Sequence, residues 1–398
     1  MKINILLFLT ILVSSNAITQ PTKTYLMAYH TCSSSSSCSN PANHTVRLAE
    51  SNNGSSWTSV PGYNTISNSG SVPDVITRGD KLYLYSTSGV RRYTKSTNTW
   101  ETSATTISVK DAGGANVFYV DPSLIVDGSG NLVLFFLESA GPGTGDPAAC
   151  SSYPCTKNFK SATEVSGSNG TQFVVNSGTR LSINLNANTA SDPDIYYDGT
   201  RYILYISSGT NTLAYTAASL HGTYTAVTTL NNAVLTNEGG IGCGYFDPTT
   251  NNYWTYVHTN AGEIKLKVHS SINSSISGLS MVINYATAGL ASGSLAQSPG
   301  ICKNELTTTT AVSNLSSGQF IKLYPNPVRN DLTIKYDLGM QTSVSMKIFD
   351  KNGALITHKK INTTGTRINT GNFSNGMFLV LFYDKNGRIL YADKIIKE

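Results

Sequence analysis

Carboxylate side chains recur at three proline-containing corners of this sequence, and paired carboxylates are groups that general acid–base chemistry uses. The corners are Val72-Pro73-Asp74, Asp121-Pro122-Ser123 and Asp192-Pro193-Asp194. If the corners meet in the fold, Asp74, Asp121 and Asp192 would share one site. The alternative is structural, because an Asp at a strand corner often accepts a hydrogen bond from its own backbone in an Asx turn.

Each corner is the start of the same local structural unit, and this unit positions the carboxylate. A short apolar run leads to a turn glycine, and a second run rich in aromatic and aliphatic residues follows, as at Tyr202–Tyr205. This pattern is typical of a β-hairpin. The turn glycines Gly79, Gly128 and Gly199 correspond without gaps. A hairpin that recurs about every fifty residues predicts a β-propeller.

The inner and outer halves of these units predict five blades. Their approximate bounds are 24–70, 71–119, 120–189, 190–237 and 238–285. The third blade carries an insertion, Gly141 to Lys157, rich in Gly, Pro and Cys. The first blade lacks an innermost strand, so we expect a segment near Met281–Tyr285 to close the ring and cover the open edges.

Composition favours an extracellular β protein over a nucleic-acid-binding one. Charged residues make up only 13% of the chain, against about 25% in ordinary globular proteins. The net charge of +5 is uneven: residues 319–398 hold 12 Lys/Arg against 6 Asp/Glu, whereas residues 1–318 hold 16 against 17. The basic character therefore belongs to the tail and does not predict a nucleic-acid partner.

The N-terminus predicts export. Lys2 precedes an apolar run from Ile3 to Val13, and small residues follow up to Ala17. This is typical of a signal peptide over residues 1–17, and no other stretch is apolar enough to cross a bilayer. We therefore expect a protein that is secreted or held at the outer cell surface, with no transmembrane segment and a monomeric state.

Six cysteines would then lie in an oxidising compartment. Their spacing predicts Cys32–Cys38 and Cys150–Cys155 as short loop disulfides, which leaves Cys243 with Cys302. The alternative is free or metal-bound thiols, but neither short pair has Cys-x-x-Cys spacing and no His lies at zinc-finger distance.

The last 80 residues form a second domain. Residues 305–319, rich in Thr, Ser and Asn, predict a linker. Alternating strands with turns at Asp350–Gly353 and Asp384–Gly387 then predict a small immunoglobulin-like β-sandwich over 320–398. Leu323–Val328, Phe349–Gly353 and the closing Lys394–Lys397 resemble the type A C-terminal sorting domain of the type IX secretion system of Bacteroidetes. That resemblance implies a partner, the secretion machinery, and passage through the outer membrane after cleavage of the signal peptide.

The propeller, predicted over residues 18–304, resembles the five-bladed fold of the family 43 glycoside hydrolases at residues 121–136 and 242–258. The resemblance implies a catalytic base at position 72, an Asp that tunes the catalytic acid at position 121, and a Glu that is this acid at position 192. Here those positions hold Val72, Asp121 and Asp192. If the chain is an inverting hydrolase, the catalytic set we expect is Asp74 as base, Asp121 as modulator, and Asp192 or Glu238 as acid.

Other residues complete the candidate site. We expect Arg92, Asp194 and His258 to contact the ligand, a glycan or polysaccharide. In the resembled family a residue at the position of His258 helps to hold an axial ion, so a structural Ca²⁺ in the channel is implied; a buried hydrogen-bonded His is the alternative. No other cofactor is expected, because no phosphate loop, zinc set or dinucleotide fingerprint is present.

Three functions remain open at this point: a secreted glycan hydrolase, a propeller that binds glycans without cutting them, and a surface adhesion protein. Val72 and the absent Glu at position 192 weigh against the first. The carboxylates at three corners weigh against a purely structural role. Function must therefore be argued from the site.

Overall fold

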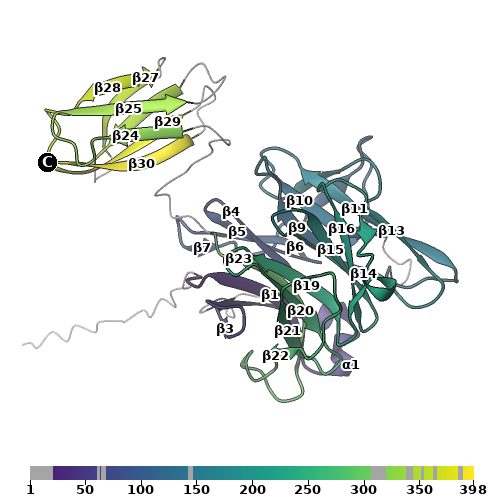
Figure 1. Cartoon of the computed structure of the whole chain (residues 1–398). Helices are drawn as coiled ribbons and strands as arrows, with labels where there is room; N and C mark the ends of the chain where they lie inside the picture. Colours follow the sequence, from purple (N-terminus) through teal and green to yellow (C-terminus); the bar gives the residue numbers. More distant parts are fainter. Residues whose placement is uncertain are drawn as a thin grey trace, which may run out of the picture. The chain divides into compact units, whose positions relative to one another are not determined.

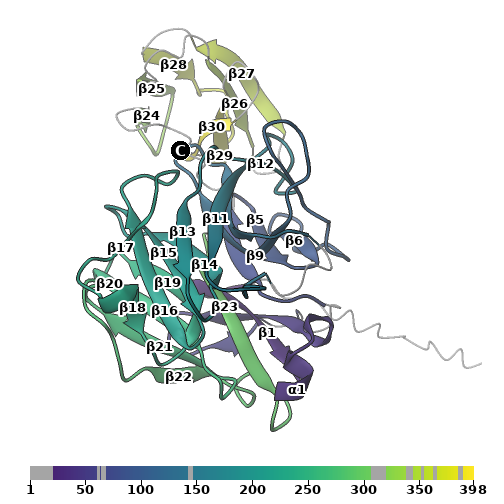
Figure 2. The same ribbon diagram turned by 90° about the vertical axis from the view of Figure 1, so that its right-hand side faces the viewer.

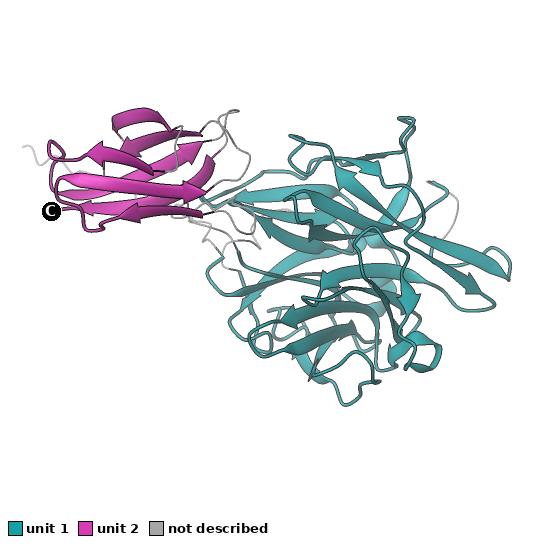
Figure 3. Cartoon of the chain, turned by 45° about the horizontal axis from the view of Figure 1, so that its top comes forward, with its two compact units in different colours: residues 1–306 teal, residues 307–398 magenta. Residues whose placement is uncertain are grey.

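The computed structural model describes residues 21–60, 63, 69–141, 147–305, 320–337, 344–350, 354–361, 365–383 and 389–398. The chain divides into unit 1, residues 1–306, and unit 2, residues 307–398 (Figure 3). The predicted signal peptide, nearly all of the linker and most residues of the two predicted turns of the tail lie outside the described residues.

The described part of unit 1 contains five β-sheets, and Figure 1 labels most of their strands. The first is ordered β23 (Leu295–Lys303), β1 (Tyr25–Cys32), β2 (Thr45–Ser51) and β3 (Thr58–Ser59). The second is β4 (Asp74–Arg78), β5 (Lys81–Ser86), β6 (Gly89–Thr94) and β7 (Thr99–Trp100). The third is β9 (Tyr119–Val126), β10 (Leu132–Glu138), β11 (Cys155–Glu164), β12 (Gln172–Val175) and β8 (Ser108–Lys110), with β13 (Leu181–Leu185) also paired to β11.

The remaining two sheets follow the same plan. The fourth is β14 (Ser191–Tyr197), β15 (Tyr202–Ser208), β16 (Asn211–Ala217) and β17 (Thr225–Ala226), with β18 (Val234–Thr236) also paired to β16. The fifth is β19 (Gly240–Asp247), β20 (Asn252–His258), β21 (Ile264–His269) and β22 (Ser280–Ile283). The helical segments α1 (Ser35–Cys38), η1 (Pro41–Asn43) and η3 (Asn231–Ala233) of unit 1 are short.

The first strand of each hairpin unit lies innermost, and these strands form a closed ring. Contacts run from β4 to β9, then to β14, β19 and β23, and from β23 back to β4. Apolar side chains of facing sheets fill the space between them, as Phe135 and Leu204 do between the third and fourth sheets. The predicted all-β propeller architecture is confirmed.

The prediction for closing the ring was wrong. Met281 to Ile283 belong to β22, which pairs with β21 at the outside of the fifth sheet. The segment that closes the ring is β23, which lies beside β1 (Figure 2) and pairs with it from Tyr25↔Lys303 to Cys32↔Leu295. Joining an early strand to a late one in one sheet pairs the inner edge of β1, which would otherwise stay open.

The five inner strands share one unusual corner. Positive φ angles occur at Val72 (45°), Asp121 (54°), Asp192 (49°), Ile241 (48°) and Ser298 (52°). The next residue is Pro in four of these corners, and it is Gly242 in the corner of β19. The strand register shifts at four of these corners, as a β-bulge does. Such a backbone is costly for β-branched residues like Val72 and Ile241, and strain of this kind concentrates at functional sites.

The residue after each Pro or Gly ties its strand to the next sheet. Leu124 N donates to Asp74 Oδ2 (2.6 Å), Ile195 N to Ser123 Oγ (3.1 Å) and Gly244 N to Asp194 Oδ2 (2.8 Å). The Cys243 thiol likewise meets the backbone of Ile301. At the fifth corner stands Gly300, where a Cβ would lie 2.5 Å from Asp74 Oδ1. The close approach of Asp74 therefore requires glycine at this position.

Unit 2 is a small β-sandwich, as predicted. One sheet is ordered β24 (Phe320–Tyr324), β25 (Asp331–Asp337) and β28 (Gly365–Asn369). The other is β27 (Leu355–Ile361), β26 (Val344–Phe349), β29 (Gly376–Tyr383) and β30 (Ile389–Lys397). Alternate residues such as Val344, Met346 and Ile348 fill the core between the sheets. Among the described residues of the whole chain, no helix is long and apolar enough to cross a membrane.

Candidate functional site

A funnel of about 540 Å³ lies over the corners of the inner strands. The positive-φ residues of all five corners line it: Val72, Asp121, Asp192, Ile241 and Ser298. Its volume is within the range of small-molecule sites, about 300–1,000 Å³. The bulged corner thus aims one side chain from each sheet at a common space.

Asp121 and Asp192 are the two acidic residues in the described lining of this funnel. Asp192 N donates to Asp121 Oδ2 (3.2 Å), so the two corners are joined directly. Ser191 Oγ donates to Asp192 Oδ2 (2.6 Å). Both aspartates are half-buried, which leaves part of each side chain open to a ligand. The structure therefore brings together two of the predicted catalytic residues.

Ser298 contributes a hydroxyl to the same floor. Its side chain is 1% exposed, and its Oγ has no hydrogen-bond partner among the described residues. Buried hydroxyls are nearly always paired, with protein or with an ordered water or ligand. The funnel floor thus combines carboxylate acceptors with a hydroxyl that lacks a protein partner.

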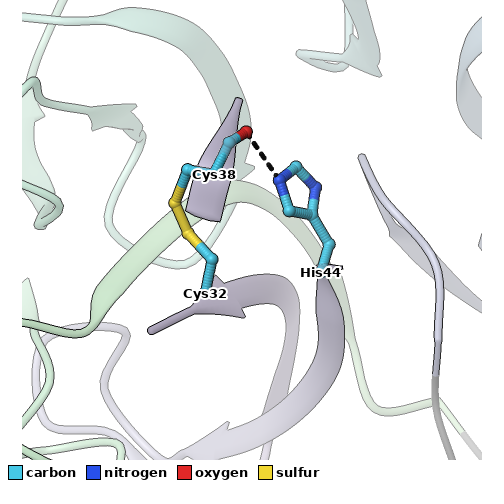
Figure 4. A group of neighbouring side chains, drawn as sticks. All are labelled: Cys32, Cys38 and His44. Atoms are coloured by element: carbon cyan, nitrogen blue, oxygen red, sulfur yellow. Dashed lines mark hydrogen bonds between the residues drawn. A yellow bond between two sulfur atoms is a disulfide. The ribbon is translucent and has the colours of Figure 1, made fainter. Parts of the chain in front are cut away.

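Two stacked histidines form one side of the funnel. The rings of His30 and His44 lie 4.0 Å apart and almost parallel, at 9°. His44 Nε2 donates to the Cys38 carbonyl oxygen (2.9 Å), on the loop that the Cys32–Cys38 disulfide closes (Figure 4). Its Nδ1 accepts from Ser71 Oγ (2.7 Å). The disulfide loop and the residue before the second sheet's corner therefore fix this wall.

Gln297 connects His30 to His258 across the funnel. Val72 N donates to His30 Nδ1 (3.2 Å), so the ring proton is on Nε2, which donates to Gln297 Oε1 (3.3 Å). Gln297 Nε2 then donates to His258 Nε2 (2.8 Å). This series of bonds requires both histidines to be neutral. Burial agrees with it, because desolvation lowers the pKa of His30 to about 3 and that of His258 to about 4.

Asp74 and Asp194, predicted as base and ligand contact, do not line the funnel. Both line a narrow axial neck of about 20 Å³ and are held by the ties to the neighbouring sheets. Desolvation raises the pKa of Asp74 to about 7. Burial, together with the nearby Asp74, raises the pKa of Asp194 well above its usual range. These two acids connect the sheets and line the neck, which shares Asp192 and Ser298 with the funnel.

Glu238 and Arg92 are also placed elsewhere. The carboxylate of Glu238 accepts from Gly278 N and, at 3.1 Å, from Leu279 N, so it fixes a loop of the fifth sheet. Arg92 pairs with Glu101 (2.6 Å) and donates to the carbonyl oxygen of Asn169 (2.8 Å). Neither side chain lines the funnel.

The disulfide predictions are confirmed in two cases and wrong in the third. Cys32–Cys38 and Cys150–Cys155 are bonded. Cys243 and Cys302 are free thiols. Successive residues of a strand face opposite ways: Ile301 packs in the same apolar cluster as Cys243, so the neighbouring Cys302 packs in a different cluster on the other face.

One group of described side chains is spaced to hold a metal ion, and a disulfide occupies two of its three members. Cys32, Cys38 and His44 lie close enough to hold an ion, but the two sulfurs are bonded to each other. His258 Nε2 already accepts from Gln297, so that nitrogen is not open to the implied axial cation. The described residues therefore do not fit a Ca²⁺ bound through His258 Nε2.

Sequence reasoning missed His30, His44, Gln297 and Ser298. Ser298-Pro299-Gly300 repeats the residue-Pro pattern of the other corners, and this signal could have located the fifth one. The histidines carry no such signal, because long-range strand pairing brings His30 and Gln297 together.

Comparison with known proteins identifies the C-terminal part of the chain. Residues 322–398 match the family described as "Secretion system C-terminal sorting domain". The tail is such a sorting domain. No curated protein sequence is significantly similar to the chain.

Several solved structures overlap the propeller weakly. A GH43_1 enzyme from Xanthomonas citri in complex with xylotriose shares 13% identity, covers 72% of this chain and 90% of its own, and has a TM-score of 0.35. A GH43 endo-arabinanase from Bacillus licheniformis shares 14%, covers 80% and 96%, and scores 0.34. A GH43_12 protein from a capybara gut metagenome shares 10%, covers 94% of each chain and scores 0.34. Overlaps this weak decide nothing about function, which must be argued from the funnel.

Proposed function

We propose that this protein is an exported propeller that binds a glycan in its funnel, with Asp121 and Asp192 as the carboxylates that contact the sugar. The proposal rests on the convergence of these two side chains with the hydroxyl of Ser298, which has no hydrogen-bond partner in the described part of the chain. Carboxylates accept hydrogen bonds from sugar hydroxyls, and a serine hydroxyl can both donate and accept. A polyhydroxylated ligand would satisfy all three groups at once.

Recognition without cleavage is the function these residues support best. The position of the expected base holds Val72, while Asp74 and Glu238 are engaged in structural hydrogen bonds. Hydrolysis is the second candidate, favoured by one observation: Asp121 and Asp192 are adjacent, since the backbone of one donates to the carboxylate of the other. Glycoside hydrolysis needs two such carboxyl groups on either side of the scissile bond.

We further propose that the chain leaves the cell through the type IX secretion system, after removal of residues 1–17, and is held at the surface or released. The sorting domain at 322–398 supports this route. The propeller would then meet its glycan outside the cell.

Calorimetric titration of the purified protein with a panel of plant and microbial oligosaccharides tests the binding function, and reducing-sugar release from the same panel tests hydrolysis. We expect saturable binding of at least one glycan without turnover. Turnover that Asp121→Asn or Asp192→Asn abolishes would establish the hydrolase instead. Absence of any binding across the panel would contradict both functions.

A further inference from the structure

A second hollow, of about 420 Å³, adjoins the funnel on the insertion of the third sheet. Pro147 lines both spaces; Ala148 faces the funnel, and Ala149 and Cys150 face the second hollow. Polar residues, Glu138, Ser139, Ser151, Thr156, Lys157 and Asn158, supply most of its remaining lining. The two spaces therefore share one wall, residues 147–150.

This wall is fixed from several directions. Lys157 Nζ donates to the carbonyl oxygens of Pro147 and Ala149. Cys150 is bonded to Cys155, at the start of β11. Ala190 N, two residues before Asp192, donates to the Ala148 carbonyl oxygen (3.2 Å). A wall held in this way can shape a site with little loss of conformational entropy on binding.

The described lining of the funnel offers no Lys or Arg to an acidic ligand. In the second hollow, Lys157 uses two of its three N–H donors on backbone carbonyl oxygens, and Glu138 pairs with Lys160. Asp121 and Asp192 carry the ionisable acid groups of the described funnel lining. An anionic sugar placed there would face carboxylates without a counter-charge, which is unfavourable.

We propose that the funnel and the second hollow are adjacent subsites for one neutral oligosaccharide of more than one sugar unit, with residues 147–150 as the wall between them. This inference rests on the proposed glycan binding. One sugar unit would occupy the funnel over Asp121 and Asp192. The chain would continue past Pro147, so that a further unit meets the polar lining of the second hollow.

The experiment compares binding of neutral xylo-, arabino-, manno- and cello-oligosaccharides of one to six units with binding of oligogalacturonides of matched length. The test variant is Ala149→Trp, which fills the second hollow without removing a hydrogen-bonding side chain. Its matched control is Ser152→Trp, at an exposed position of the same insertion that does not line the hollow. Asn158→Ala, which truncates a lining side chain, is a second variant in case Ala149→Trp does not fold.

We expect affinity for the neutral series to rise with length beyond the monosaccharide, and oligogalacturonides to bind more weakly. Ala149→Trp should weaken binding of the longer neutral ligands by about tenfold or more and leave the monosaccharide unaffected. Ser152→Trp should match wild type.

The second subsite alone would be overturned if folded Ala149→Trp and Asn158→Ala both bound the long ligands with wild-type affinity while Asp121→Asn still lost binding. A panel without any neutral binder would overturn the proposed function itself, and tight binding of oligogalacturonides would overturn neutral specificity.

Discussion

One backbone conformation gives two different roles to the aspartates of the corners. The first residue of each corner, with positive φ, faces the funnel, as Asp121 and Asp192 do. The residue two positions later reaches the next sheet, as Asp74 and Asp194 do. A β-bulge inserts an extra residue into a strand and so changes which face the following side chains take. Sequence spacing alone therefore could not assign these roles.

The neutral histidines predict a specific pH dependence. His258 has a pKa of about 4 in the fold, whereas an unfolded His titrates near 6.5. As pH falls, His258 takes up a proton in the unfolded state before it does so in the folded state. The stabilisation that neutral His258 gives the fold is therefore present above about pH 6.5 and is lost as pH falls towards 4. Asp74, with a pKa raised to about 7, acts oppositely: its contribution is present below about pH 4 and lost as pH rises through 7.

We therefore expect His258→Gln to become more stable relative to wild type, by about 2–3 kcal/mol, when the pH is lowered from 7.5 to 4.5. Urea unfolding followed by Trp fluorescence measures this difference. The signal reports unit 1 alone, because Trp57, Trp100 and Trp254 all lie there and the chain has 3 Trp. An equal stability difference at both pH values would contradict the neutral-histidine arrangement.

The cysteines give a second test at the residue scale. Alkylation after denaturation without reductant should label two thiols per chain, Cys243 and Cys302, and leave the other four unlabelled. In the native protein Cys243 should resist labelling because its side chain is fully buried. Mass spectrometry of the digest identifies the labelled sites. A Cys243–Cys302 disulfide peptide would show that the structure is wrong here.

At the scale of elements, the inner strands and their ties hold the sheets in a ring. The recurring hairpin units predicted four of these strands from the sequence. The fifth, β23, was missed, because Ser298-Pro299-Gly300 in its middle looks like a turn, although it repeats the residue-Pro pattern of the other corners. The apolar Met281–Tyr285 looked more like a strand and was chosen for the closing role, although its place is the outer edge of the fifth sheet.

Removing one tie should destabilise the ring measurably. Asp74→Ala leaves the buried N–H of Leu124 without its acceptor, at a cost of about 2–3 kcal/mol. The matched control is Asp111→Ala, which removes an exposed carboxylate that also accepts a backbone N–H, from Ala115. Urea unfolding should show a much smaller loss for the control. Similar losses in both variants would contradict a special role for Asp74.

At the scale of the whole molecule, export and recognition belong to different units. The sorting domain lies within residues 322–398, and the funnel lies entirely in unit 1. Sequence motifs sufficed to find the tail, since its motifs are local. The funnel site could be found only in part, since its histidine wall and Gln297 come from strands far apart in the chain.

Deleting residues 320–398 should therefore stop export without unfolding the propeller. In the native host we expect the truncated chain to accumulate in the periplasm, with the Trp fluorescence spectrum of the full-length protein. Fractionation and immunoblotting measure its location, and a reporter protein fused to residues 320–398 is the positive control. Normal amounts of truncated chain in the medium would contradict the role of the tail.

The proposed glycan site is the funnel over Asp121 and Asp192. A crystal structure of the full chain with the tightest oligosaccharide from the panel would locate the bound sugar. We predict a sugar ring whose hydroxyls lie within hydrogen-bond distance of the Asp121 and Asp192 carboxylates and of Ser298 Oγ. A sugar bound only on the outer strands, with the funnel holding solvent, would contradict the proposed site.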